Sequence, residues 1–190
     1  MSGNVVITGL GAVSSLGVGI DEHREALLGG RRCMAAPTVF DVGQSEPFPV
    51  AEIKAGGRFA KLPASLERYD TREARICRHA CREALSDSGA PDFYDHDIAF
   101  YVGTTSSGVH ELEEAWAGYK STGAVAAEWD FANQHLAGAI ARAMVKSLGL
   151  TGMHTTVSTA CSSSANAMIL AALDIIEGRC RAAAVLGVDT

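Results

Sequence analysis

Short apolar runs alternate along the chain with longer stretches of helical periodicity, and this alternation restricts the fold more than any other feature. Three runs have the length and apolar content of buried strands: DIAFYVG, HTTVST and AAAVLGV. Between each run and the next lies at least one segment with apolar residues at helical spacing. Strands that alternate with helices predict an α/β fold with a mainly parallel sheet and helices on both of its faces.

The remaining segments give weaker or more local signals. An apolar run from Val5 to Thr8 predicts a further buried strand, which breaks at the glycines that follow. Asp21 to Leu28 has a helical pattern with an acidic N-cap and a double glycine at its end. Residues 31–64 hold all but one of the prolines, so we expect an irregular excursion with at most one short strand pair.

Helical periodicity is clearest in the second half of the chain. RYDTREARICRHACREALSDSGA repeats its apolar residues at helical spacing and ends at Gly89. HELEEAWAGY and FANQHLAGAIARAMVKSLG are also expected to be helical. The segment from Ser162 to Glu177 is apolar almost all round, which is typical of a central helix buried between two layers.

The composition limits the classes of protein and their location. The net charge is −6 and Lys and Arg form no long run, so nucleic-acid binding has no electrostatic footprint. No apolar run reaches the roughly 18 residues expected of a membrane-spanning helix, and the N-terminus lacks the basic start of a secretory signal. The cysteines are odd in number and without framework spacing, which favours the reducing cytoplasm.

Cys161 lies in VSTACSSSANA, where the strand pattern gives way to the apolar helix. The first turn of a helix has free backbone N–H groups and the positive end of the macrodipole. This position favours the nucleophilic thiolate, and the N–H groups can stabilise an oxyanion. The small residues around the cysteine would let an acyl chain reach the sulfur. From its position alone, Cys161 is either a nucleophile at an elbow-like turn or a buried small apolar side chain.

Other clusters of reactive residues give weaker signals. On a helix, Cys77 and Cys81 of CRHAC share a face that His79 does not, so we expect core cysteines and no metal site. GLGAVSSLG does not match the dinucleotide-binding fingerprint, because its third glycine is misplaced. Three further histidines have no partner at a catalytic spacing and are expected to be surface or internally satisfied: His110, His135 and His154.

Several segments together resemble one family. VVITGLGAVSSLG is similar to its opening strand and turn, and RYDTREARICRHACREALSDSG to a helix that ends in a DAG-like tripeptide. VGTTSSGVHELE, TACSSSANA and AAAVLGVDT are similar to a strand-loop-helix, an active-site junction and the strand beyond it. The family is that of the β-ketoacyl synthases of fatty-acid and polyketide assembly, in the thiolase superfamily. The Thr-Ala-Cys-Ser-Ser-Ser run separates this group from thiolases, initiating ketoacyl synthases and chain-length factors.

The resemblance implies a thiolase-like layered fold, of which residues 1–190 form the N-terminal half. It implies that Cys161 takes an acyl group from an acyl carrier protein and that a decarboxylated malonyl-carrier thioester then attacks it. The backbone N–H of Cys161 would be one oxyanion-hole donor, and no metal or redox cofactor is needed. In the family the loop after the second strand lines the acyl channel, so Ser106 in GTTSSG is a candidate substrate-binding residue; an ordinary polar turn is the alternative.

The sequence departs from the family pattern in one respect. Family members use two further histidines and a lysine from a second, homologous half, and none of the histidines here lies in such a motif. We therefore expect a fragment of a longer synthase, or a chain whose second half is a separate polypeptide, with no condensing activity of its own. The expected partners are that complementary C-terminal half, an acyl carrier protein, and a homodimeric or heterodimeric ketosynthase-type subunit paired through HTTVST.

Two other functions remain open. A non-condensing thiolase-fold acyltransferase would keep Cys161 without the histidine pair. A structural or interaction module would have no activity of its own. A cysteine hydrolase is less favoured, because no histidine is placed to serve as its base.

Overall fold

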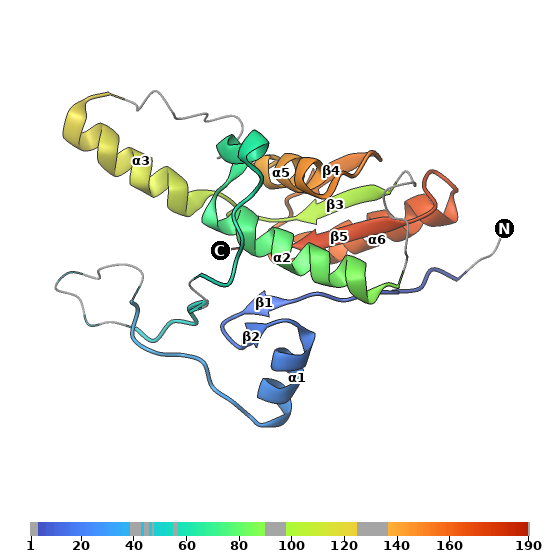
Figure 1. The fold of residues 1–190 in the computed structure, drawn as a ribbon, viewed down its shortest axis with the longest axis horizontal. Coiled ribbons are helices and arrows are strands. Elements are labelled where there is room, and N and C mark those ends of the chain that lie inside the picture. Colours follow the sequence, from blue (N-terminus) through green and yellow to red (C-terminus); the bar gives the residue numbers. More distant parts are fainter. Residues whose placement is uncertain are drawn as a thin grey trace.

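A three-stranded parallel sheet forms the centre of the computed structural model, which describes residues 4–38, 43, 46, 48–54, 57–89, 98–124 and 137–189. The strands are β3 (Ala99–Gly103), β4 (His154–Val157) and β5 (Ala183–Gly187), in the order β4-β3-β5. In the middle strand, Phe100 is paired with His154 on one side and Ala184 on the other. These three predicted strands and their parallel arrangement are therefore confirmed (Figure 1).

Helices pack on both faces of the sheet (Figure 1). On one face, α2 (Arg72–Asp87) and α5 (Ala139–Leu148) cover Phe100 and Val102 of β3. On the other face, α6 (Ser163–Ile176) packs on Tyr101 and its neighbours. All residues of β3 are buried, because its side chains alternate between these two layers. The predicted α/β class, with helices on both faces of a mainly parallel sheet, is confirmed.

Helix α2 shows how local sequence fixes an element. The side chain of Thr71 caps it by accepting a hydrogen bond from the backbone N–H of Ala74 at 3.1 Å. Cys77 and Cys81 recur at helical spacing on its buried face, as predicted. Burial raises the pKa of both thiols, that of Cys81 to about 12, so neither is a reactive thiolate at neutral pH.

The remaining elements flank this layered core, and Tyr69 of one of them is buried in it. They are the antiparallel pair β1 (Val13–Ser14) and β2 (Gly17–Val18), α1 (Ile20–Leu28), a 3₁₀ segment (Ala64–Tyr69) and α3 (Val109–Thr122). Helix α1 begins at Ile20 with Gly19 as its N-cap residue, so the predicted cap at Asp21 is wrong.

Three further expectations agree with the structure as far as it describes them. Between residues 31 and 64, one isolated bridge joins Ala35 to Val50, in agreement with an irregular excursion that holds at most a short strand pair. Helix α3 contains the stretch HELEEAWAGY that was expected to be helical and extends beyond it at both ends. The helix predicted from residue 131 is confirmed as α5 from Ala139 onward, and residues 131–136 lie outside the described residues.

The predicted strand from Val5 to Thr8 is wrong. These residues form no strand, and Val6 and Ile7 are each 69% exposed. The chain that follows runs along α2, where the N–H of Leu10 donates to Asp87 Oδ2 at 2.9 Å. Gly9 permits this close approach, because a Cβ there would lie 2.1 Å from a backbone oxygen of α2. The apolar pattern suggests pairing with another strand, but this segment of the chain contacts the side chains and backbone of α2 instead.

Helix α6 is the predicted central helix, but the described chain covers only one of its faces. Ser163, Ala167 and Ala171 are buried against the sheet. Five of its large apolar residues are 40–56% exposed: Met168, Ile169, Leu170, Leu173 and Ile176. The expected burial on every side is therefore wrong for this chain by itself, because no described element covers the far face. No helix in the described ranges is long and apolar enough to cross a membrane.

Candidate active site

Cys161 lies between β4, which ends at Val157, and α6, which begins at Ser163. This is the strand-to-helix junction that the sequence predicts. Its side chain is exposed, which rules out the alternative of a buried small apolar residue in this chain. Cys161 therefore has the access to solvent that a nucleophile requires, in contrast to the two buried cysteines of α2.

The backbone turns sharply immediately before Cys161. Ala160 has a φ of 53°, the left-handed region, and no other non-glycine residue among those described has a positive φ. This conformation costs a residue with a Cβ roughly 1–2 kcal/mol. Such outliers cluster at functional sites, and a strained strand-turn-helix is the geometry of a nucleophile elbow.

Hydroxyl groups from the serine run hold this turn. Ser163 Oγ accepts a hydrogen bond from the Thr159 N–H at 2.8 Å and donates to the Ala160 carbonyl at 2.6 Å. Ser162 Oγ donates to the Thr159 carbonyl at 2.7 Å. The serines that follow the cysteine thus fix the backbone from residue 159 to 163 and keep Ala160 in its strained conformation.

The backbone N–H of Cys161 donates no hydrogen bond to any described residue. It lies at the start of α6, whose N-cap residue, Ser162, makes no side-chain capping bond. Amides at a helix N-terminus lie at the positive end of the macrodipole. A free donor beside the thiol is the arrangement that an oxyanion hole needs.

The loop after β3 contacts the same turn of α6. A Cβ at Gly103 would lie 2.5 Å from the backbone of Ser163 and Ser164, so only glycine allows the two segments to approach this closely. Thr105 Oγ1 is 3.5 Å from Ser163 Oγ. The structure thus brings the loop that contains Ser106 next to the helix turn that contains Cys161.

Asp189 anchors this loop from the end of β5. Its Oδ1 accepts hydrogen bonds from the N–H groups of Thr105 and Ser106 at 2.7 and 2.8 Å, and from Thr104 Oγ1 at 3.0 Å. Partial burial raises the pKa of this carboxyl, but the hydrogen bonds from Ser106 and Thr105 outweigh it and the pKa lies below its usual value. Ser106 Oγ is 3.3 Å from the same oxygen, so the hydroxyl also serves the turn itself.

Glu73 anchors the other end of the loop from the first turn of α2. The residue is 3% exposed, and its Oε2 accepts hydrogen bonds from Ser107 Oγ at 2.9 Å and from the Gly108 N–H at 3.0 Å. Neither anchor was predicted from the sequence. Asp189 could have been found from its place directly after a strand, whereas an acidic residue in a first helical turn is too common to be a signal.

The other predicted candidates do not join this site. Cys77 and Cys81 face the core, and the ring of His79 makes an edge contact with Phe59 on another side of α2. His154 is exposed at the start of β4, in agreement with a surface histidine. Two candidates have side chains outside the described part of the chain: His110 and His135.

Comparison with known proteins identifies the family. A family model described as the β-ketoacyl synthase N-terminal domain matches residues 2–190. A Streptomyces halstedii protein described as a putative polyketide β-ketoacyl synthase 1 is 28% identical in an alignment that covers 94% of this chain and 44% of that protein. The chain thus spans less than half the length of this curated relative.

Solved structures show the same fold. A β-ketoacyl synthase from Burkholderia phymatum STM815 has a TM-score of 0.76 at 24% identity, over 91% of this chain and 43% of that chain. A ketosynthase from Xenorhabdus doucetiae, in complex with its chain length factor, has a TM-score of 0.76 at 21% identity, over 97% of this chain and 48% of that chain. The fold is therefore thiolase-like, as predicted. Since the family model matches nearly the whole chain, this chain belongs to the β-ketoacyl synthase family, as a member of its N-terminal domain.

Proposed function

We propose that this chain is part of a β-ketoacyl-[acyl carrier protein] synthase and that Cys161 is its acyl-accepting nucleophile. One observation carries the proposal: an exposed thiol follows a strained turn at a helix N-terminus, and its own N–H has no acceptor among the described residues. Membership of the family supports it. Fatty-acid and polyketide synthesis are both compatible with this chemistry.

In the first half-reaction, the Cys161 thiolate attacks the thioester carbonyl of an acyl carrier protein. A new C–S bond forms, and the negative charge moves to the carbonyl oxygen, to which the Cys161 N–H donates. When the tetrahedral intermediate collapses, the C–S bond to the carrier breaks and the carrier thiolate leaves. The product of this step is an acyl thioester on Cys161.

In the second half-reaction, a malonyl-carrier thioester loses CO₂ and the electron pair of the broken C–C bond forms a carbanion. This carbanion attacks the acyl carbonyl on Cys161, and the cysteine thiolate leaves as the β-ketoacyl product forms. Described side chains that hydrogen-bond within the Cys161 turn bear hydroxyl groups or, at Asn166, an amide, with no histidine or lysine among them. A complementary C-terminal half would therefore supply the groups that assist decarboxylation.

The partners follow from two uncovered surfaces. The exposed apolar face of α6 would be covered by the complementary half. β4 lies at the end of the sheet with one edge unpaired among the described residues, and this edge would pair with a second ketosynthase-type subunit, identical or related. The ketosynthase from Xenorhabdus doucetiae is in complex with a chain length factor, which supports a paired subunit. The five free cysteines support a reducing, cytoplasmic location.

An acyl-transfer assay on the complete protein tests the proposal. Intact-mass spectrometry after incubation with an acyl-carrier thioester should show one acyl adduct, and added malonyl-carrier thioester should release CO₂ and a β-ketoacyl product. Cys161→Ala should abolish the adduct, and Cys33→Ala should leave it unchanged. An adduct without condensation would indicate the non-condensing acyltransferase, and no adduct at all would indicate an interaction module.

A further inference from the structure

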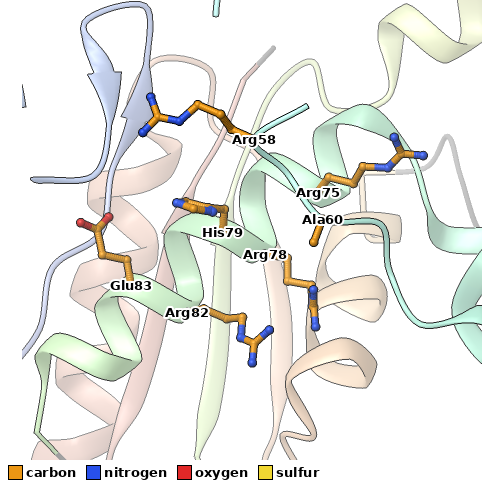
Figure 2. A pocket seen from close by; sticks show the side chains of 7 residues that line it. All are labelled: Arg58, Ala60, Arg75, Arg78, His79, Arg82 and Glu83. Atoms are coloured by element: carbon orange, nitrogen blue, oxygen red, sulfur yellow. The ribbon is translucent and has the colours of Figure 1, made fainter. Parts of the chain in front are cut away.

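A pocket of about 320 Å³ lies on the face of α2 that points away from the sheet. Helix α2 contributes most of its lining, and Arg58 and Ala60 from the preceding segment complete it (Figure 2). The pocket shares no residue with the Cys161 turn or with the loop that contacts it. Its size is at the lower end of the range for small-molecule sites.

Three of the charged groups that line the pocket already have partners. Arg58 pairs with Glu22 at 2.6 Å, and Arg75 makes two hydrogen bonds of 2.8 Å to Asp70. Glu83 accepts hydrogen bonds from two backbone N–H groups of the N-terminal segment, at 3.0 and 2.7 Å. Arg58 and Arg75 are therefore paired with carboxylates, and the oxygens of Glu83 are bound to backbone N–H groups.

Of the charged groups that line the pocket, Arg78 and Arg82 are the two with no hydrogen bond or ion pair to a described residue. The Nε of Arg78 is buried and has no hydrogen-bond acceptor. Arg82 follows one turn later, and the guanidinium groups of both residues lie on the same side of α2, with those of Arg58 and Arg75 turned away (Figure 2). A buried donor without an acceptor lowers stability, and no described residue supplies the acceptor that Arg78 Nε lacks.

We propose that this pocket binds a phosphate group, free or as the monoester of a small molecule, between Arg78 and Arg82. Two planar guanidinium forks match the dianionic charge and terminal oxygens of a phosphate better than the single charge of a carboxylate. Because α2 and α6 lie on opposite faces of the sheet, the pocket stays accessible when a partner covers α6. The site goes beyond the acyl chemistry proposed for Cys161 and does not depend on it.

Calorimetric titration of the complete protein with inorganic phosphate, at constant ionic strength, tests the site. The pocket variant is Arg78→Gln with Arg82→Gln. The matched control is Arg24→Gln with Arg32→Gln, which removes the same charge from exposed positions outside the pocket. The pocket variant should bind phosphate roughly tenfold more weakly or worse, and the control should stay within about twofold of the parent protein.

A single variant and a second ligand extend the experiment. If circular dichroism shows that the double variant is unfolded, Arg82→Gln alone, at an exposed position, should still weaken phosphate binding. A parallel titration with glycerol 3-phosphate distinguishes the two sources, since tighter binding of the monoester indicates an organic ligand and tighter binding of phosphate indicates the free anion. No saturable binding of either probe, or an equal loss in the control, would overturn the proposal.

Discussion

The two faces of the central sheet differ in how completely their side chains are buried. On the α2 and α5 side, a cluster of fifteen buried residues fills the space between helices and sheet, and Met144 and Val102 are 0% exposed. On the α6 side, the cluster has four buried residues, and the outer surface of the helix is apolar and exposed. Both layers rest on the same strand, β3, so the difference lies in what covers the helices and not in the sheet.

We therefore expect the α2 and α5 face to contribute most to stability and the α6 face to contribute to function. The α2 and α5 face is packed as closely as the interior of a folded domain. The α6 face carries Cys161 at one end and an apolar surface along its length, and such a surface marks an interaction site.

The largest expected effect comes from a matched pair of methionines. Met144→Ala on α5 should lower the free energy of unfolding by about 2–5 kcal/mol, because it opens a cavity in the filled core. Met168→Ala on α6, which is 49% exposed, should cost less than about 1 kcal/mol. Urea denaturation of both variants measures the difference, and similar losses would mean that the two faces are packed alike.

Self-association should depend on the exposed face of α6. Residues 1–190 by themselves should sediment as a dimer or larger species, because the uncovered apolar surface drives association. Leu173→Gln with Ile176→Gln should move the population toward monomer, whereas Leu27→Gln with Leu28→Gln on α1, also exposed, should not. Analytical ultracentrifugation decides the matter, and a compact monomer of the parent chain would contradict the account.

The Asp189 anchor should make the site region sensitive to acid. Since the folded pKa lies below the usual value, the stabilisation is present above about pH 4 and is lost as the pH falls through the folded pKa. Asp189→Asn should lower the melting temperature at pH 7 by about 2–4 °C. The gap to the parent protein should close toward pH 3, while the exposed control Asp21→Asn should show no such gap. A gap independent of pH would remove the carboxylate from this role.

The smallest effect concerns the acyl channel. If Ser106 lies at the channel, Ser106→Phe in the complete enzyme should slow acylation by long chains by about tenfold and leave short chains within about twofold. Ser121→Phe, on α3, serves as the control for a bulky residue elsewhere. An unchanged chain-length profile, measured with a series of acyl-carrier thioesters, would leave Ser106 with its turn contact to Asp189 alone.

Much of the fold could be predicted because its signals are local. The periodicity of α2 and the apolar run of β3 depend on a few neighbouring residues each. The run from Val5 to Thr8 has the same local signal, yet the chain beyond it binds side chains of α2 that are more than 70 residues away. A local sequence pattern does not show whether such a segment will pair with a distant strand or pack on a distant helix.

The site divides in the same way. Cys161 was predictable because its position between strand and helix can be recognised in the sequence itself. The strained φ of Ala160 and the anchor at Glu73 were not, since the first depends on hydroxyl contacts and the second on a loop that lies about 35 residues away. The predicted burial of α6 on every side was wrong. The apolar sequence of the helix does not indicate whether the element that would cover its outer face is part of the same chain.

The central claim is that Cys161 is the covalent nucleophile, and labelling of the folded complete protein tests it most directly. Iodoacetamide should modify Cys161 before Cys33, Cys77, Cys81 and Cys180, as measured by peptide mapping over time. Prior incubation with an acyl-carrier thioester should protect Cys161 and leave the other rates unchanged. Earlier labelling of Cys33 or Cys77 with Cys161 inert, or labelling of Cys161 that the acyl donor does not slow, would contradict the account.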